Sequence, residues 1–265
     1  MAECIHGFES GLCDICFPRT PPEPVVATAP ATRPSSKAGS TRPPRAAKPV
    51  AGRAGASAGR TVAAPPFGSR RLYHVTHLRN LESILLDGEV KARASGLEPD
   101  VDVAAPLVRE LRANADAGDG RRVTEFVPFS LSPDSDRWSE LREGAEGAQW
   151  SPEARETGPA DYAVLVVIGK EVGTDVVVAD GDASAPLTGF TIGDPAKAVQ
   201  RLLRTDPELT AAEVLVPGPV LLTSVNLIAV ANDPTRARVR RMFADIEGAP
   251  PRVVVHPPWF AAPVE

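Results

Sequence analysis

Cysteine is scarce in this chain of 265 residues: there are three, and all of them lie within the first 16 residues. The remainder therefore cannot rest on a framework of disulfide bonds. Long apolar runs are missing too, since the longest, from Tyr162 to Ile168, is far shorter than the roughly 20 residues that cross a bilayer. The N-terminus has cysteines and charges where the apolar core of a signal peptide would lie. We expect a soluble protein of the cytoplasm that engages no membrane.

Large apolar residues are almost absent from residues 18–69, which are rich in Pro, Ala, Gly, Ser and Arg. Such a composition buries too little apolar surface to offset the entropy cost of ordering, so we predict a flexible linker there. The hydrophobic content of the chain, 43%, is ample for one core in residues 70–265. The sequence thus predicts a short N-terminal segment of residues 1–17, the linker, and one folded domain.

The three cysteines are Cys4, Cys13 and Cys16, and His6 lies among them. Three thiolates and one imidazole form a tetrahedral ligand set for Zn²⁺, and a segment this small would need the metal in order to fold. We predict a structural zinc knuckle in residues 1–17. The alternatives are a redox pair of Cys13 and Cys16, or free thiols in a flexible tail.

Charge is unevenly distributed along the chain, whose net charge is −5. Residues 1–71 contain ten Lys or Arg against four Asp or Glu, whereas the remainder contains 19 against 30. A basic arm ahead of an acidic domain is expected if the arm attracts nucleic acid without sequence preference. A solvated basic linker without a partner would have the same composition.

The pattern of a folded domain begins at residues 72–88, LYHVTHLRNLESILLDG. Its first residues favour a strand, and apolar residues then recur at helical spacing until Gly88. The strand would deliver His74 and His77 to a turn, with a helix opening at about Asn80. Amide groups at a helix start favour a phosphate or a polarised sugar. The alternatives are a structural or surface role for His77 and an N-cap role for Asn80.

Further elements are indicated by apolar runs and by periodicity. Strands are expected at 126–132, 161–168, 175–179, 211–216, 220–230 and 253–255, and helices at 105–115, 195–203 and 234–246. The nearly continuous apolar run at 161–168 indicates a strand buried on both faces. In the helix at 105–115, Leu107, Val108 and Leu111 are expected to face inward.

Glu213 stands out in the strand expected at 211–216, because alanines precede it and three aliphatic residues follow it. Burying an unpaired carboxylate is costly. Glu213 is therefore either a surface residue on a half-exposed strand or a placed functional group, and the local pattern favours neither.

Three segments resemble, in the same order, motifs of the DarT family, DNA ADP-ribosyltransferases that use NAD⁺ to modify a base in single-stranded DNA. They are YHVTHLRNLESIL at 73–85, FVPF at 126–129 and AEVLV at 212–216. The tail VVVHPPWF at 253–260 is also typical of the family. The resemblance leaves the first seventy residues unexplained.

The resemblance implies an α+β ADP-ribosyltransferase fold, in which a split mixed β-sheet holds NAD⁺ in a cleft. The implied activity is that of a glycosyltransferase: transfer of ADP-ribose to a base in single-stranded DNA by a toxin-like or defence enzyme. The implied partners are NAD⁺, single-stranded DNA and a neutralising antitoxin protein.

The site residues follow from the same resemblance. Glu213 would stabilise the positive charge that develops on the ribose of NAD⁺, and would also act as a base. An arginine upstream of the FVPF segment would act in the NAD⁺ site; Arg112 and Arg109 both fit, with Arg121 and Arg122 as substitutes. A guanidinium suits pyrophosphate in particular. The residues expected to contact NAD⁺ are His74, Thr76, Asn80 and Phe129.

The sequence departs from the family after Phe129, where SLSPD at 130–134 replaces the usual Tyr-Phe and Ser-Pro-Met. No histidine occurs between His77 and His256, so a histidine that helps to deprotonate the acceptor base has no counterpart. The modified base therefore stays open. Two alternatives remain: an acceptor in RNA or in a protein, and a zinc-containing nucleic-acid-binding module without enzyme activity.

Overall fold

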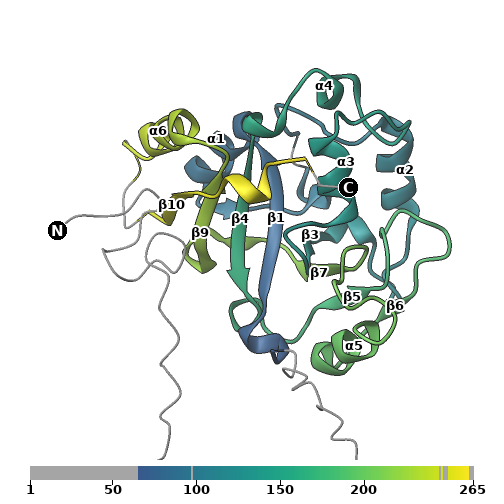
Figure 1. The fold of residues 1–265 in the computed structure, drawn as a ribbon. Coiled ribbons are helices and arrows are strands. Elements are labelled where there is room, and N and C mark those ends of the chain that lie inside the picture. The colour runs from purple at the N-terminus through teal and green to yellow at the C-terminus, as the bar shows by residue number, and fades with distance from the viewer. Residues whose placement is uncertain (1–64, 97, 245, 247–249, 263–265) are drawn as a thin grey trace, which may run out of the picture.

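The computed structural model describes residues 65–262, apart from 97, 245 and 247–249. This part of the chain is a mixed α+β fold built on one large sheet (Figure 1), which confirms the predicted fold class. The packed structure already includes Phe67, a buried residue of the short turn Phe67–Ser69, three residues ahead of the predicted domain start at 70. The predicted zinc ligands Cys4, His6, Cys13 and Cys16 lie outside the described residues, as does the linker up to residue 64.

The large sheet has eight strands in the order β10-β9-β4-β1-β3-β7-β5-β6. Adjacent strands of this sheet pair antiparallel, except β9 and β10, which pair in parallel, so the sheet is mixed. The strands are β1 (Arg71–His77), β3 (Phe126–Ser130), β4 (Tyr162–Ile168), β5 (Val177–Ala179), β6 (Phe190–Thr191), β7 (Glu213–Pro217), β9 (Val225–Val230) and β10 (Arg252–Val255). Two short strands, β2 (Glu89–Val90) and β8 (Val220–Leu221), form a separate pair.

The sheet divides between β1 and β3, where one residue pair, Tyr73 and Ser130, is in register. On its other side, β1 is in register with β4 along its whole length. Beside that single pair, the ring of His74 reaches across, with Nδ1 2.9 Å from the carbonyl oxygen of Pro128. A side chain thus bridges the two halves where the backbone ladder is missing, and the split sheet implied by the resemblance is present.

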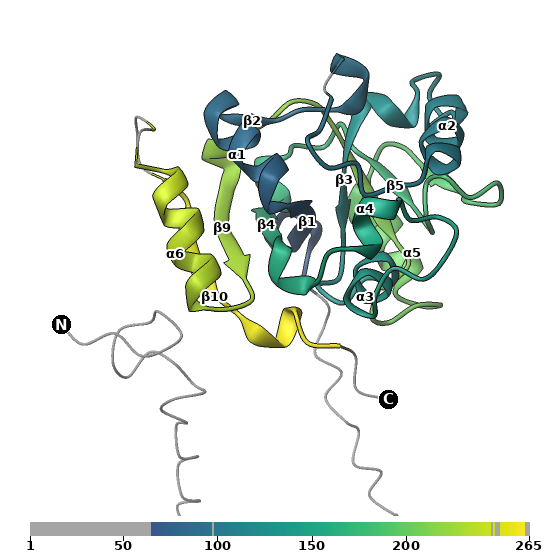
Figure 2. The same ribbon diagram turned by 90° about the horizontal axis from the view of Figure 1, so that it is seen from above.

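Helices pack against both faces of the sheet, as Figure 2 shows from above. The helices are α1 (Leu78–Asp87), α2 (Pro106–Asn114), α3 (Asp136–Arg142), α4 (Pro152–Arg155), α5 (Pro195–Leu202) and α6 (Asp233–Met242). Leu165 and Val167 of β4 lie in the apolar cluster that includes residues of α1, α5 and α6, whereas Val164 and Val166 lie in the cluster that includes residues of α3 and α4. The prediction that this strand is buried on both faces is confirmed.

Helix α1 begins directly after β1, at Leu78, and not near Asn80 as predicted. His77 is its N-cap, since its Nδ1 accepts a hydrogen bond from the amide of Arg79 at 3.2 Å. The His77 ring is buried edge-on against Tyr162. His77 is therefore structural, and the N-cap role considered for Asn80 was wrong.

Helix α2 corrects another prediction, because Leu107 and Leu111 face outward, with 65% and 41% of their surface exposed. Its inward face instead carries Val108 and, four residues later, Arg112. The apolar spacing was misleading because an arginine with a buried acidic partner occupies an inward position. The periodicity of apolar residues alone does not register such a pair.

The run at 220–230 is likewise not one strand, since the turn Leu222–Ser224 separates β8 from β9. The predicted edge strand at 253–255 is present as β10 and lies at the end of the sheet. None of the helices in the described ranges combines the length and apolar character needed to cross a membrane.

Candidate active site

A cavity of about 350 Å³ opens where the sheet divides, between β1, β3, α1 and α2. All seven of the residues predicted to be catalytic or to contact NAD⁺ line it: His74, Thr76, Asn80, Arg109, Arg112, Phe129 and Glu213. They come from four separate segments of the sequence. These seven residues therefore come together at the place where the sheet divides.

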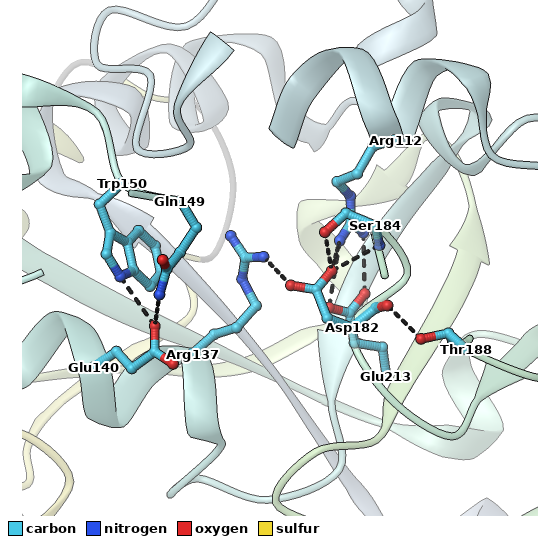
Figure 3. A network of polar contacts seen from close by, with 9 residues as sticks. All are labelled: Arg112, Arg137, Glu140, Gln149, Trp150, Asp182, Ser184, Thr188 and Glu213. Atoms are coloured by element: carbon cyan, nitrogen blue, oxygen red, sulfur yellow. Dashed lines mark hydrogen bonds and ion pairs between the residues drawn. The ribbon is translucent and has the colours of Figure 1, made fainter. Parts of the chain in front are cut away.

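The centre of the site is a two-pronged contact between Arg112 of α2 and Glu213, the first residue of β7 (Figure 3). Nη2 of Arg112 lies 3.0 Å from Oε2 of Glu213, and Nη1 lies 3.4 Å from Oε1. Glu213 is 6% exposed, which excludes the reading of it as a surface residue. Buried carboxylates require a charged or hydrogen-bonding partner, and Arg112 supplies one.

Asp182 and Arg137 extend this pair, and neither was predicted. Oδ1 of Asp182 lies 3.3 Å from Nη1 of Arg112, and Oδ2 forms an ion pair with Arg137 of α3. Burial favours the neutral carboxyl, but Arg137 and hydrogen bonds from Ser184 lower the pKa of Asp182 to about 2. The four side chains therefore alternate in charge: Arg137, Asp182, Arg112 and Glu213. A signal for Asp182 existed in its position soon after a buried strand, but nothing in the sequence marked its partners.

The charge of Arg112 is secured by the same neighbours. Burial of its guanidinium opposes the charged form, but the carboxylates of Glu213 and Asp182 raise the pKa of Arg112 above its usual value. Arg112 is therefore a permanent cation in the wall of the cavity. A delocalised guanidinium of this kind suits an anionic ligand such as pyrophosphate.

Arg109 lies one turn earlier on α2 and points to a different partner. It forms an ion pair with Asp102, which also lies 3.1 Å from Arg93. The side chain of Arg109 is 37% exposed. Of the two arginines that the sequence left open, Arg112 is thus the one in contact with Glu213.

The two substitutes considered for this arginine lie outside the cavity. The guanidinium of Arg121 binds Asp119 and Asp175, and that of Arg122 donates to the carbonyl of Asn114. Neither lines the cavity.

His74 has one defined tautomer, because a carbonyl oxygen only accepts hydrogen bonds. Nδ1 must carry the proton that is donated to Pro128, so Nε2 of the neutral ring is an acceptor. Burial lowers the pKa of His74 below its ordinary value, although the bond to Pro128 works in the opposite direction. The ring therefore stays neutral at pH 7 and offers one acceptor nitrogen beside the cavity.

Asn80 uses both ends of its amide on the backbone of Val101. Nδ2 donates to the carbonyl of Val101, and Oδ1 accepts from its amide, both at 2.8 Å. Asn80 thus holds the segment around Val101 at the cavity wall. A direct contact with NAD⁺ would have to replace one of these bonds.

Phe129 and Thr76 complete the wall of the cavity. Phe129 is 1% exposed, and its ring is tilted against that of His74 with 5.5 Å between centroids. Thr76 is buried in β1, two residues after His74. The stacking role of Phe129 stays a prediction, and its visible contact is support of His74.

Across residues 65–262, gaps excepted, no group of three or more His, Cys, Asp and Glu residues is arranged to hold a metal ion. The four predicted zinc ligands belong to the segment before residue 65.

A split mixed sheet, with Arg112 and Glu213 paired beside a cavity, agrees with the ADP-ribosyltransferase fold that the resemblance implies. A sequence model of one family, described as "ssDNA thymidine ADP-ribosyltransferase, DarT", matches residues 73–261. The chain belongs to the DarT family. Its activity is accordingly NAD⁺-dependent ADP-ribosylation of single-stranded DNA, as the sequence predicted.

Solved structures with a similar fold include proteins of Thermus and Thermosipho. Thermus sp. 2.9 DarT in complex with ADP-ribosylated ssDNA has a TM-score of 0.61 and 22% identity, over 72% of this chain and 96% of that chain. The same protein in complex with NAD⁺ has a TM-score of 0.54 and 21% identity, over 72% and 98%. Thermosipho africanus DarTG in complex with ADP-ribose has a TM-score of 0.57 and 19% identity, over 72% and 51%. The comparison with curated proteins gave no match.

Proposed function

We propose that Arg112 and Glu213 form the catalytic centre of a transfer of ADP-ribose from NAD⁺ to thymine in single-stranded DNA. The observation that carries this assignment is the two-pronged contact of Arg112 with Glu213 in the cavity that His74 also lines. The thymine acceptor is supported by the family description. The structures of Thermus sp. 2.9 DarT in complex with NAD⁺ and with ADP-ribosylated ssDNA support both substrates.

The chemistry of NAD⁺ explains why the site needs these groups. Breaking the bond between ribose and nicotinamide leaves positive charge on the ribose, and a carboxylate placed beside it stabilises that charge. Glu213 fills this role in our proposal. Arg112 holds the carboxylate in its orientation through two contacts, and supplies positive charge for the pyrophosphate. Nε2 of His74 accepts a hydrogen bond from a ribose hydroxyl.

The transfer step balances without a further reactant. The C1′–N bond of NAD⁺ breaks, and nicotinamide leaves as a neutral molecule with the bonding electrons. A ring nitrogen of the base forms the new bond to C1′, and its proton passes to Glu213 and then to water. Single-stranded DNA suits this step because an unpaired base is accessible without the cost of opening a duplex.

The test is incubation of the full chain with labelled NAD⁺ and separate pools of single-stranded DNA, RNA and protein. We expect label on the DNA pool, with transfer reduced at least about 10²-fold in Glu213→Gln, since the main charge-stabilising group is removed. Glu153→Gln is the matched control, because Glu153 is exposed on α4, away from the cavity. Label on RNA or protein alone, or full activity in Glu213→Gln, would refute the proposal.

A toxin-like role and an antitoxin partner belong to the same proposal. Their support is the resemblance of the sequence and the name DarTG of the Thermosipho structure. We place the enzyme in the cytoplasm, where NAD⁺ and DNA are available. Expression of the wild-type chain should arrest bacterial growth, whereas expression of Glu213→Gln should not; equal growth would contradict a toxic activity.

A structural zinc ion bound by Cys4, His6, Cys13 and Cys16 also remains a proposal, supported by the ligand set and spacing alone. Elemental analysis of the full chain should find stoichiometric zinc that is lost in a Cys13→Ser/Cys16→Ser variant. Equal zinc contents in the two proteins would refute this assignment.

A further inference from the structure

A second cavity, of about 340 Å³, adjoins the one assigned to NAD⁺. Four residues line both cavities: Ser130, Ser135, Arg137 and Glu213. Glu213 therefore lies in a shared wall, with space on either side. A transferase needs two substrates to meet at the reacting carbon, and this arrangement offers a place for each.

Arg137 is held in this shared wall by two contacts. One edge of its guanidinium forms the ion pair with Asp182, and its carbon Cζ lies 5.0 Å from the centroid of the Trp150 ring. Trp150 is itself fixed, since its Nε1 donates to Oε2 of Glu140 at 3.0 Å (Figure 3). The side chain of Arg137 remains 30% exposed. A planar cation with five N–H donors is thus oriented by its neighbours while part of it stays open to a ligand.

The charges around the second cavity indicate what kind of ligand it takes. Four carboxylates line it, from Asp136, Glu140, Asp182 and Glu213, and Arg137 is the single cationic side chain among the described residues of the lining. A phosphate would meet this acidic surface unfavourably. A neutral base avoids that repulsion, and its carbonyl oxygens match the donors of Arg137.

We propose that the second cavity binds the acceptor base, and that Arg137 donates a hydrogen bond to the carbonyl oxygen next to the attacking ring nitrogen. This inference rests on the proposed function. As the N–H bond breaks and its proton passes to Glu213, negative charge spreads from the nitrogen to that oxygen. Arg137 stabilises this charge while the nitrogen bonds to C1′ and nicotinamide leaves. Bases with a ring N–H beside a carbonyl, such as thymine, are selected over cytosine and adenine, which lack one.

The test compares two reactions of the same protein: hydrolysis of NAD⁺ by water, and transfer to a thymine-containing oligonucleotide. In Arg137→Gln we expect the ratio of transfer to hydrolysis to fall roughly 10²-fold, the usual effect of removing one donor to a developing oxyanion. The rise of the transfer rate with pH should also move to higher pH, because the base loses its proton less readily. Arg137→Lys, which keeps the charge, should restore part of the ratio. Arg201→Gln, on the exposed side of α5, is the matched control.

An equal loss of hydrolysis and transfer, with an unchanged pH profile, would overturn the inference, because Arg137 would then only support Asp182 and Arg112. An unchanged ratio would overturn it as well. Failure of the proposed function looks different: the wild-type chain would then hydrolyse NAD⁺ without labelling the oligonucleotide, or would do neither.

Discussion

Arg112 and Glu213 are 101 residues apart in sequence and meet through two contacts, of 3.0 and 3.4 Å, in the wall of the cavity. Both side chains are largely withdrawn from water. A buried pair of this kind adds little net stability over a well-packed apolar pair, but the loss of one partner leaves the other charge buried without compensation. The pair therefore ties the activity of the enzyme to the packing of α2 against β7.

The first prediction concerns the loss of that partner. Arg112→Met should lower the free energy of unfolding by about 3–5 kcal/mol, because Glu213 would stay buried without a countercharge. Denaturant unfolding of the domain measures this change. Arg109→Met is the matched control, and its more exposed pair with Asp102 should contribute about 1 kcal/mol at most. Equal effects of the two substitutions would contradict the difference in burial.

Asn80 supports a second prediction. Asn80→Ala removes two hydrogen bonds to Val101 and should cost about 1–3 kcal/mol, because buried partners lose their bonds. The segment at the cavity wall should loosen, so the KM for NAD⁺ should rise. Glu82→Gln is the control on the same helix, since Glu82 is exposed and does not line the cavity. An equal change of KM in both variants would show that the hydrogen bonds of Asn80 to Val101 do not shape the NAD⁺ site.

A third prediction follows from the acidity of Asp182. Its folded-state pKa of about 2 lies below the about 3.9 of an unfolded aspartate, so its ionised form favours folding. That contribution is complete above about pH 4 and is lost as the pH falls through the folded-state pKa of about 2. Urea unfolding at a series of acidic pH values should therefore show a weaker pH dependence in Asp182→Asn. Asp175→Asn, at an exposed position, should retain the wild-type dependence.

His74 gives a fourth prediction, on substrate binding. Because burial lowers the pKa of His74, Nε2 keeps its lone pair at pH values where an exposed histidine would already be protonated. The KM for NAD⁺ should stay constant down to about pH 6.5, the ordinary histidine value, and rise only below it. Kinetics across this range test the claim. A rise in KM that begins above that value would show that His74 is charged in the free enzyme.

Several features of this protein could be predicted from the sequence alone, because they depend on residues close together in the chain. The junction of β1 and α1 is one, since residues 72–88 contain a strand pattern, a helical pattern and a terminating glycine, Gly88, with φ 71°. The doubly buried strand β4 is another. Glu213 was recognised because a carboxylate ahead of three aliphatic residues requires an explanation, and the family motif supplied one.

Other features were decided only by the tertiary structure. Arg109 and Arg112 lie one turn apart on α2, and their sequence does not show which one meets Glu213. Leu107 and Leu111 face outward for a related reason. The side of α2 that packs inward is the one from which Arg112 reaches Glu213, and Glu213 lies on a distant segment of the chain. Arg137 and Asp182 form their ion pair although 45 residues separate them in sequence. The second cavity is likewise lined by residues from several distant segments. Local pattern reports what a residue is and what its chain neighbours are, whereas a charged site depends on which distant segments the sheet brings into contact.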